Sequence, residues 1–291
     1  MERVNFDAWW DYDRPDETER RFRELLPAAE ADGPQDYLIE LLTQIARAQG
    51  LQRQFAAAHA TLDQAQRLLE TGDFPRARLR YLLERGRVFN SAQMQAEALP
   101  LFTVGWELAQ MAREDFYAVD AAHMMGIAAP PDEQLDWNHR ALAAAEASAD
   151  PRARQWMGSL YNNIGWTYHA AGRYAEALDI FQKALKWREA QGQEAPTRIA
   201  RWCVARTLRS LNRISEAFEI QLHLLAELQQ SGARDGYVFE ELGECGLLLG
   251  QPETAGYFAQ AYAELSQDAW LAANEPARLE RLKMLSQPPP E

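Results

Sequence analysis

The sequence has little of several features that mark particular classes of protein. Only two of its 291 residues are cysteines, Cys203 and Cys245, which are too few for a disulfide framework. No charge-free stretch approaches the roughly 18 apolar residues that a bilayer span needs. The first residues lack a basic region followed by an apolar one, so no secretory signal is visible. We therefore expect a soluble, reduced protein of the cytoplasm that does not contact membranes.

Positive charge and catalytic motifs are also scarce. Asp and Glu number 43 against 30 Lys and Arg, a net charge of −13, which opposes binding to nucleic acid. There is no Gly-rich phosphate loop, Gly-x-Ser-x-Gly elbow or His-Glu-x-x-His motif. The five histidines lie far apart, with no second histidine three or four residues away. We therefore expect no catalytic residue, no metal site, no cofactor and no enzyme activity.

A repeat of about 40 residues accounts for nearly the whole chain. Its clearest unit runs from Tyr161 to Leu185, and Gly172 divides that unit into two helical patterns. In the first pattern, residues 161, 164, 165 and 168 share one helix face, and the second has an apolar stripe that includes Phe181. The same frame recurs at seven anchor residues, which are Thr18, Ala58, Ala98, Gln134, Ala177, Ala217 and Ala255.

The clearest unit resembles the tetratricopeptide repeat. The residues that carry the resemblance are Tyr161, Ile164, Gly165, Tyr168, Gly172, Tyr174, Ala177, Phe181 and Ala184. Glu189 stands where the family often has a closing proline, and the unit exceeds the usual length of about 34 residues. In this it is similar to the longer-helix members among bacterial regulators and motor light chains. The resemblance implies an all-α, right-handed superhelical solenoid of antiparallel helix hairpins. Its concave face would bind peptides or proteins, without chemistry.

The repeat frame also predicts the domain organisation. We expect an irregular N-terminal hairpin or cap over residues 1–34 and six repeats over residues 35–266, about seven hairpins in all. A capping helix over 267–285 and a disordered tail over 286–291 follow. Pro276 is expected to bend or interrupt the cap. Pro27 and Pro100 lie nearer helix interiors, so we expect local kinks or a shifted boundary there.

One stripe of each first helix is predicted to line the concavity. It lies one residue beyond the stripe that packs on the partner helix, and so about 100° further round. Despite the negative net charge it is rich in Arg, Asn, His and Trp, which bind partners well. We therefore predict a noncatalytic scaffold for an acidic or carboxylate-bearing peptide. The predicted partner-binding residues are Arg47, Arg80, Arg87, Asn90, His123, Asn162, Trp166, His169, Trp202, Arg206 and Arg209.

Several alternatives stay open at the level of the sequence. These arginines could instead be solvated or paired with neighbouring carboxylates such as Glu84 and Asp120. The chain could be a self-associating scaffold, a homodimer through the capping helix or through an aromatic N-terminus. It could also be a peptide-sensing regulatory subunit, and its own termini could occupy the groove. The N-terminal aromatic residues are Phe6, Trp9, Trp10 and Phe22.

Two narrower functions of the family are not expected. The carboxylate clamp of chaperone adaptors needs lysines at set places beside its asparagines. The sequence has Asn162 and Asn163 but no Lys at the corresponding positions. The bacterial peptide-sensing regulators carry an additional N-terminal DNA-binding or effector domain. The 34 residues before Gln35 are too few for one.

Overall fold

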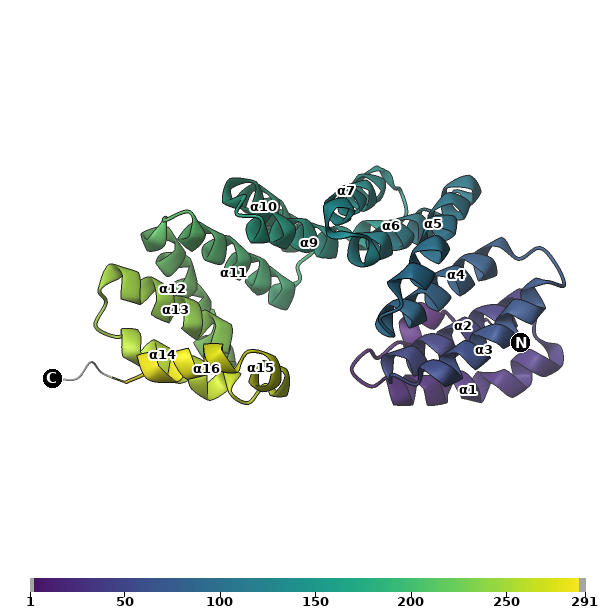
Figure 1. Cartoon of the computed structure of the whole chain (residues 1–291), viewed down its shortest axis with the longest axis horizontal. Coiled ribbons are helices and arrows are strands. Elements are labelled where there is room, and N and C mark those ends of the chain that lie inside the picture. Colours follow the sequence, from purple (N-terminus) through teal and green to yellow (C-terminus); the bar gives the residue numbers. More distant parts are fainter. Residues whose placement is uncertain (1–2, 288–291) are drawn as a thin grey trace. The chain divides into compact units, whose positions relative to one another are not determined.

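The computed structural model describes residues 3–287, and every regular element in that range is a helix (Figure 1). The chain divides into two compact units, Met1–Leu160 (unit 1) and Tyr161–Glu291 (unit 2). Unit 1 contains the 3-10 helix η1 (Phe6–Trp9), α1 (Pro15–Asp32), α2 (Gln35–Leu51), α3 (Phe55–Leu69), α4 (Pro75–Ser91), α5 (Gln95–Ala112), α6 (Asp115–Ala128), α7 (Pro131–Ala147) and α8 (Pro151–Gln155). Helix α9 (Met157–Ala170) crosses the division. Unit 2 continues with α10 (Tyr174–Ala190), α11 (Glu194–Ser210), α12 (Ile214–Ser231), α13 (Gly236–Leu249), α14 (Thr254–Leu265), α15 (Ala269–Asn274) and α16 (Pro276–Leu285).

The repeat consists of antiparallel helix hairpins, α2/α3, α4/α5 and α6/α7 followed by α9/α10, α11/α12 and α13/α14. In four of them the anchor residue is the fourth residue of the second helix and is fully buried: Ala58, Ala98, Ala177 and Ala217. In the last hairpin Phe258 packs on Gly243, so Thr254, four residues earlier, takes the anchor position. The sequence frame had placed it at Ala255, one residue too far along.

The turn inside a hairpin also repeats. Arg53, Gln93, Gly172 and Asn212 occupy equivalent turn positions and have φ angles of 61°, 64°, 72° and 61°. The next residue donates its backbone N–H to a carbonyl five residues earlier in the chain, as from Arg173 to Tyr168 at 2.9 Å. This left-handed turn satisfies carbonyls that the helix end leaves free. Glycine adopts this conformation without a steric penalty, but only one of these four positions, residue 172, is a glycine.

First helices form an inner layer in each unit. Helix α2 packs on α4 and α4 on α6, and α11 contacts α13. Among the described helices, the second helices α3, α5 and α7 make no contact of comparable extent with one another. We call the side chains that α2, α4 and α6 present on this layer the first-helix face of unit 1. Those of α9, α11 and α13 form the first-helix face of unit 2.

The N-terminal residues were predicted to be an irregular hairpin or a cap. They form η1 and the single helix α1, joined by an irregular stretch. Phe6 of η1 is buried against Phe22 and Tyr37, with ring centroids 5.8 and 5.0 Å apart. Because Phe6 and Phe22 are buried in unit 1, they do not form an exposed apolar surface for a second copy.

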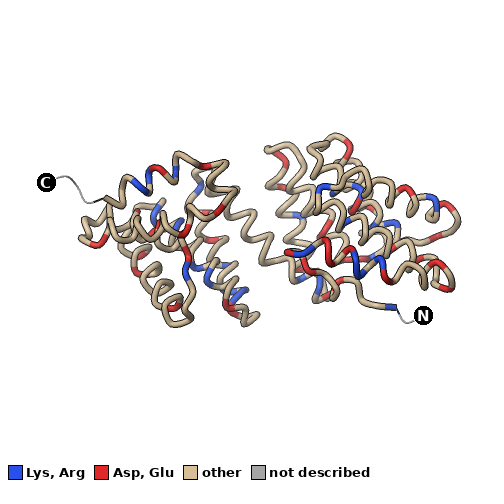
Figure 2. The backbone as a smooth tube through the Cα atoms, turned by 90° about the horizontal axis from the view of Figure 1, so that it is seen from below, with Lys and Arg blue, Asp and Glu red and all other residues tan. Residues whose placement is uncertain are grey.

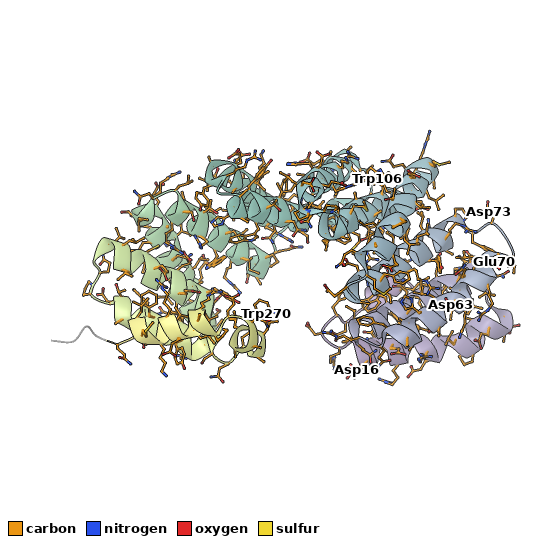
Figure 3. The ribbon with its side chains drawn as sticks, viewed as in Figure 1. Asp16, Asp63, Glu70, Asp73, Trp106 and Trp270 are labelled. Atoms are coloured by element: carbon orange, nitrogen blue, oxygen red, sulfur yellow. The ribbon has the colours of Figure 1, made fainter. Side chains whose placement is uncertain are left out.

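The predicted capping segment is divided into two helices. Pro276 begins α16, which packs on α14, and the short α15 precedes it. Figure 3 labels Trp270 on α15 and Trp106 on α5. Trp270 is 62% exposed, whereas Trp106 packs edge-on against Trp137 with centroids 5.9 Å apart. Within the predicted tail, residues 288–291 lie outside the described residues.

Other prolines lie inside helices or at their first residue. Pro27 and Pro100 are inside α1 and α5, and both helices continue through them. Pro75, Pro131 and Pro151 each begin a helix, where a missing N–H leaves no hydrogen bond unmade.

Candidate partner-binding faces

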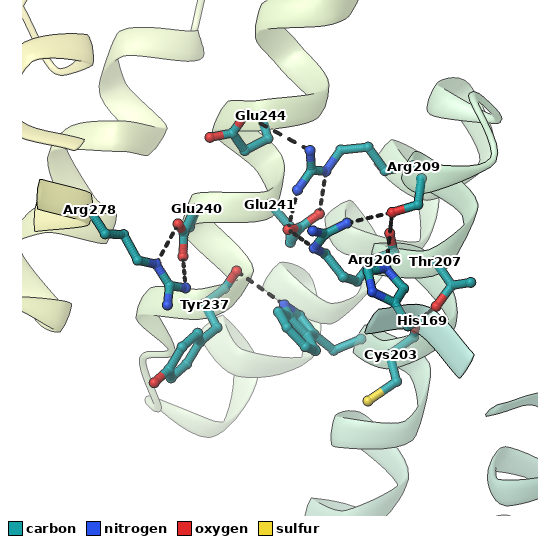
Figure 4. Close-up of polar contacts among 12 residues, drawn as sticks. His169, Cys203, Arg206, Thr207, Arg209, Tyr237, Glu240, Glu241, Glu244 and Arg278 are labelled. Carbon is teal, nitrogen blue, oxygen red and sulfur yellow. Dashed lines mark hydrogen bonds and ion pairs between the residues drawn. The ribbon is translucent and has the colours of Figure 1, made fainter. Parts of the chain in front are cut away.

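Acidic and basic residues are interspersed along the helices of both units (Figure 2). On the first-helix face of unit 2, Arg206 and Arg209 of α11 reach across to Glu241 of α13 (Figure 4). Arg209 donates to the two oxygens of Glu241 from Nε at 2.7 Å and Nη2 at 2.8 Å, and Nε of Arg206 lies 3.2 Å from the same carboxylate. Glu241 is 3% exposed. The two guanidinium groups therefore neutralise a buried carboxylate and join neighbouring repeats.

The ion pairs continue into the capping helix. Arg278 of α16 donates from Nε to Glu240 at 2.9 Å and from Nη1 to Glu275 at 3.0 Å. Arg281 pairs with Glu244, which also lies 4.0 Å from Nη1 of Arg209. Four arginines thus form ion pairs with four carboxylates. Their formal charges cancel, so the cluster has no net charge. Its members are Arg206, Arg209, Arg278, Arg281, Glu240, Glu241, Glu244 and Glu275.

A row of aromatic rings crosses the same face, one ring from each first helix. Ring centroids of Trp166 and Trp202 lie 5.9 Å apart, and those of Trp202 and Tyr237 lie 6.0 Å apart. Nε1 of Trp202 donates to the backbone oxygen of Tyr237 at 3.1 Å (Figure 4). Since the indole is fixed by this bond, its position is set before any partner arrives.

An apolar hollow lies beside the aromatic row. Its volume is about 400 Å³, and its lining residues are Arg198, Ile199, Trp202, Leu224, Leu228, Asp235, Tyr237 and Val238. Ile199 is 59% exposed and Tyr237 is 37% exposed. Large apolar side chains that stay exposed around a hollow are typical of surfaces that bind a partner.

The arginines of unit 1 are paired in the same way. Arg47 of α2 donates to Glu84 of α4 at 3.1 Å, and Arg87 donates to Glu84 at 2.7 Å and also to Asp120 of α6. Burial acts to lower the pKa of Arg87, but Asp120 and Glu84 outweigh it and raise that pKa above its ordinary value. For Arg47 and Arg87 the structure therefore shows the pairing with Glu84 and Asp120 that the sequence left open as an alternative.

Arg80 has one carboxylate partner from a repeat and one from the N-terminal segment. Its Nε lies 3.0 Å from Glu40 of α2, and its Nη2 donates to Asp7 at 3.4 Å. Nε1 of Trp10 donates to Oε1 of Gln44 at 2.9 Å. Residues 5–12 therefore lie on the first-helix face of unit 1. Nothing in the repeat frame locates this segment, because the segment is outside the repeats.

A second hollow, of about 430 Å³, lies between this segment and α4, α6 and α8. Residues from the segment that line it include Asp7, Trp10 and Tyr12, and on the other side it is lined by Tyr117, Arg152 and Trp156 among others. Burial raises the pKa of Tyr117 to about 12, so its phenol keeps its proton at neutral pH.

The remaining predicted residues are half-buried on the same faces. The His123 ring lies 4.8 Å from Trp156, and Nε2 of His169 lies 3.0 Å from Oγ of Ser210. Burial lowers the pKa of both histidines. Sγ of Cys203 donates to Oδ1 of Asn162 at 3.8 Å, and Asn90 lies near the end of α4. The structure thus gathers the eleven predicted residues into two groups, one on each unit.

Groups that could support chemistry are sparse in the part of the chain that the structure describes. There, no three His, Cys, Asp or Glu side chains lie close enough to hold a metal ion. Burial raises the pKa of Cys203 and of Cys245 to about 12, so neither thiol is an activated nucleophile. Between residues 3 and 287, no helix is both long and apolar enough to span a bilayer.

Comparison with known proteins shows the class of fold. Residues 158–190, within the unit that was clearest in the sequence, match the family model of the tetratricopeptide repeat. Over the rest of the chain the likeness is one of fold: an all-helical, solenoid-type arrangement like that of solved tetratricopeptide-repeat proteins. No curated protein matches the sequence.

Three solved structures illustrate this likeness. A signal-transduction ATPase with a tetratricopeptide-repeat sensor, from Pyrococcus horikoshii, has a TM-score of 0.72 at 15% identity and covers 94% of this chain. This chain spans only 42% of that protein. Apo RapI has a TM-score of 0.71 at 10% identity, over 91% of this chain and 76% of RapI. The apo quorum sensor NprR from B. thuringiensis has a TM-score of 0.64 at 16% identity, over 96% of this chain and 79% of NprR.

Proposed function

We propose that the chain is a noncatalytic module that binds a protein or peptide segment on its first-helix faces. The observation that carries the proposal is the open apolar hollow of unit 2, where Ile199 and Tyr237 stay exposed beside a hydrogen-bonded Trp202. Ion pairs between repeats hold this face rigid, so a partner would bind a preformed surface. The fold supports the proposal, because NprR, which it resembles with a TM-score of 0.52, binds a cognate peptide, NprX.

The proposed ligand has an apolar side chain for the hollow and a carboxylate beside it. Since the arginine cluster is already neutralised by its own carboxylates, we assign most of the affinity to the apolar side chain. Arg206 offers the carboxylate contact, because its side chain is 27% exposed and shares Glu241 with Arg209. A peptide lacking the acidic group would therefore bind more weakly but still bind.

Peptides selected from a random displayed library against the whole chain test this proposal. Affinities of synthetic copies are measured by calorimetry for the parent and for Ile199→Asp, with Trp270→Ala as the control at another exposed apolar site. We expect Ile199→Asp to weaken binding at least about tenfold and the control to leave it unchanged. Equal affinities for all three chains would refute the hollow as the binding site.

A further inference from the structure

We propose that the first-helix face of unit 1 is an interaction surface for an acidic–aromatic segment of a partner protein. In the structure, residues 5–12 of the chain itself occupy part of that surface. The inference rests on the proposed peptide-binding function and gives it a second site, on the other unit and with a different ligand chemistry. Its argument starts from what these residues contact.

The segment is bound through side chains of the first helices. Asp7 accepts a hydrogen bond from Arg80 at 3.4 Å, and Trp10 donates to Gln44 at 2.9 Å. The guanidinium carbon of Arg47 lies 5.3 Å from the Trp10 ring centroid and 5.5 Å from that of Tyr12. Two arginines and an amide thus contact a carboxylate and two electron-rich rings, a combination that suits a short peptide segment.

The same segment is only partly integrated into the fold. Phe6 is buried, but the Asp7 side chain is 37% exposed and Tyr12 is 58% exposed. The Asp7–Arg80 contact is long, at 3.4 Å, and cation–π contacts are individually weak. A competing segment could therefore replace Asp7 and Tyr12 and displace Trp10 from its edge-on contact with Phe22, while Phe6 stays in the core.

The face also has a buried polar group to which this segment makes no hydrogen bond. Tyr117 lines the adjoining hollow of about 430 Å³ and is 2% exposed. Its hydroxyl is buried and has no hydrogen-bond partner among the described residues. A buried hydroxyl without a partner is costly. This hydroxyl is therefore an unused hydrogen-bond donor at the wall of the hollow.

The recognised pattern follows from the spacing within the chain. Asp7 precedes Trp10 by three residues, and Tyr12 follows two residues later. We assign the partner as a protein segment with a carboxylate about three residues before an indole or phenol ring. A second copy of this chain could supply the same residues, and the test distinguishes that source.

The probe is a fluorescein-labelled peptide with the sequence of residues 3–14, and a matched peptide has Lys at the Asp7 position and Ala at the Trp10 position. Fluorescence anisotropy measures binding to the full parent chain, to the variant D7A/W10A, and to that variant with R80Q added. We expect D7A/W10A to bind the probe at least about tenfold more tightly than the parent does, because its own segment competes less. R80Q should abolish the gain, and the matched peptide should bind none of the three.

Equal binding to the parent and to D7A/W10A would overturn the inference. Hydrogen exchange on the parent provides a second measurement if that variant does not fold. Excess probe must then speed amide exchange in residues 5–12, and unchanged exchange would count against displacement. A dimer of the parent in sedimentation that R80Q dissociates would assign the surface to a second copy and refute a foreign partner. The probe must bind the triple variant I199D/D7A/W10A with the same affinity as D7A/W10A. A failure of the proposed site in the unit 2 hollow is then distinguishable from a failure of the proposed surface on unit 1.

Discussion

The ring of Phe181 packs directly on the backbone of Gly165, and a Cβ added to this glycine would lie 2.5 Å from Cε1 of Phe181. The same relationship holds for Gly86 with Phe102 at 2.4 Å. The first helix of these hairpins has no side chain at the point where the second helix inserts a ring. This contact sets the close approach of the two helices and explains the glycine of the repeat pattern.

Substitution of Gly165 tests that contact. Gly165→Ala is expected to lower the free energy of unfolding by about 1–3 kcal/mol, because Phe181 must shift out of a packed core. Gly256→Ala in α14 is the matched control, since nothing lies within 4 Å of the Cβ it would add. The control should be neutral or more stable by up to about 1 kcal/mol. Urea unfolding of both variants measures the difference, and equal stabilities would contradict the packing argument.

Gln221 occupies the position in α12 that Phe181 occupies in α10, since each is the eighth residue of its helix. It is fully buried, and neither its amide nitrogen nor its amide oxygen has a hydrogen-bond partner among the described residues. Gln221→Leu should therefore raise the free energy of unfolding by about 1–3 kcal/mol. The reverse change at the equivalent position of α3, Leu62→Gln, should lower it. Loss of stability in Gln221→Leu would show that the amide is satisfied after all.

The sequence predicted the hairpins because contacts such as Gly165 on Phe181 recur at a fixed spacing. Prediction was weakest where that spacing changes. Gly126 packs on Asn138, twelve residues later, because Pro130 and Pro131 shorten the turn. In the last hairpin, Gly243 and Phe258 are fifteen residues apart instead of the sixteen between Gly165 and Phe181. That difference of one residue is why the anchor was assigned to Ala255 instead of Thr254.

The candidate site was predictable in position, whereas the sequence left the pairing of its arginines open as one of two alternatives. The 100° step around each first helix placed Arg47, Arg87 and Arg209 on the first-helix faces. Each has a carboxylate partner on the next first helix, 32 to 37 residues away in sequence, and a pattern within one repeat does not fix which carboxylate that is. The N-terminal segment was not predictable in this way, because no repeat fixes where Asp7 and Trp10 lie.

Removal of Arg87 should be far more costly than removal of an exposed arginine. Arg87→Met leaves Asp120 without its ion-pair partner in a position that is 4% exposed. We expect a loss of about 3–5 kcal/mol in the free energy of unfolding. Arg213→Met is the matched control, because Arg213 pairs with Glu216 on the exposed side of α12 and should leave stability nearly unchanged. Similar losses in the two variants, measured by urea unfolding, would count against a structural role for the buried pairs.

His59 of α3 makes the stability of the fold depend on pH. Nη1 of Arg85 lies 2.8 Å from Nδ1 of His59, and an arginine can only donate, so this nitrogen must be unprotonated. Burial, followed by the charge of Arg85, lowers the pKa of His59. The unfolded chain therefore binds more protons than the folded chain as pH falls below about 6.5, and stability is lost there. His123 and His169 shift in the same direction.

Replacing His59 by asparagine isolates its contribution, because the amide oxygen of Asn can accept the hydrogen bond from Arg85 without titrating. The free energy of unfolding is measured at pH 7.5 and pH 5.5 for the parent and for His59→Asn. We expect the parent to lose more stability than the variant between these values. Burial raises the pKa of Glu40, which opposes the trend, but Glu40 is present in both proteins and cancels in the comparison. An equal loss in both proteins would mean that His59 does not titrate differently on folding.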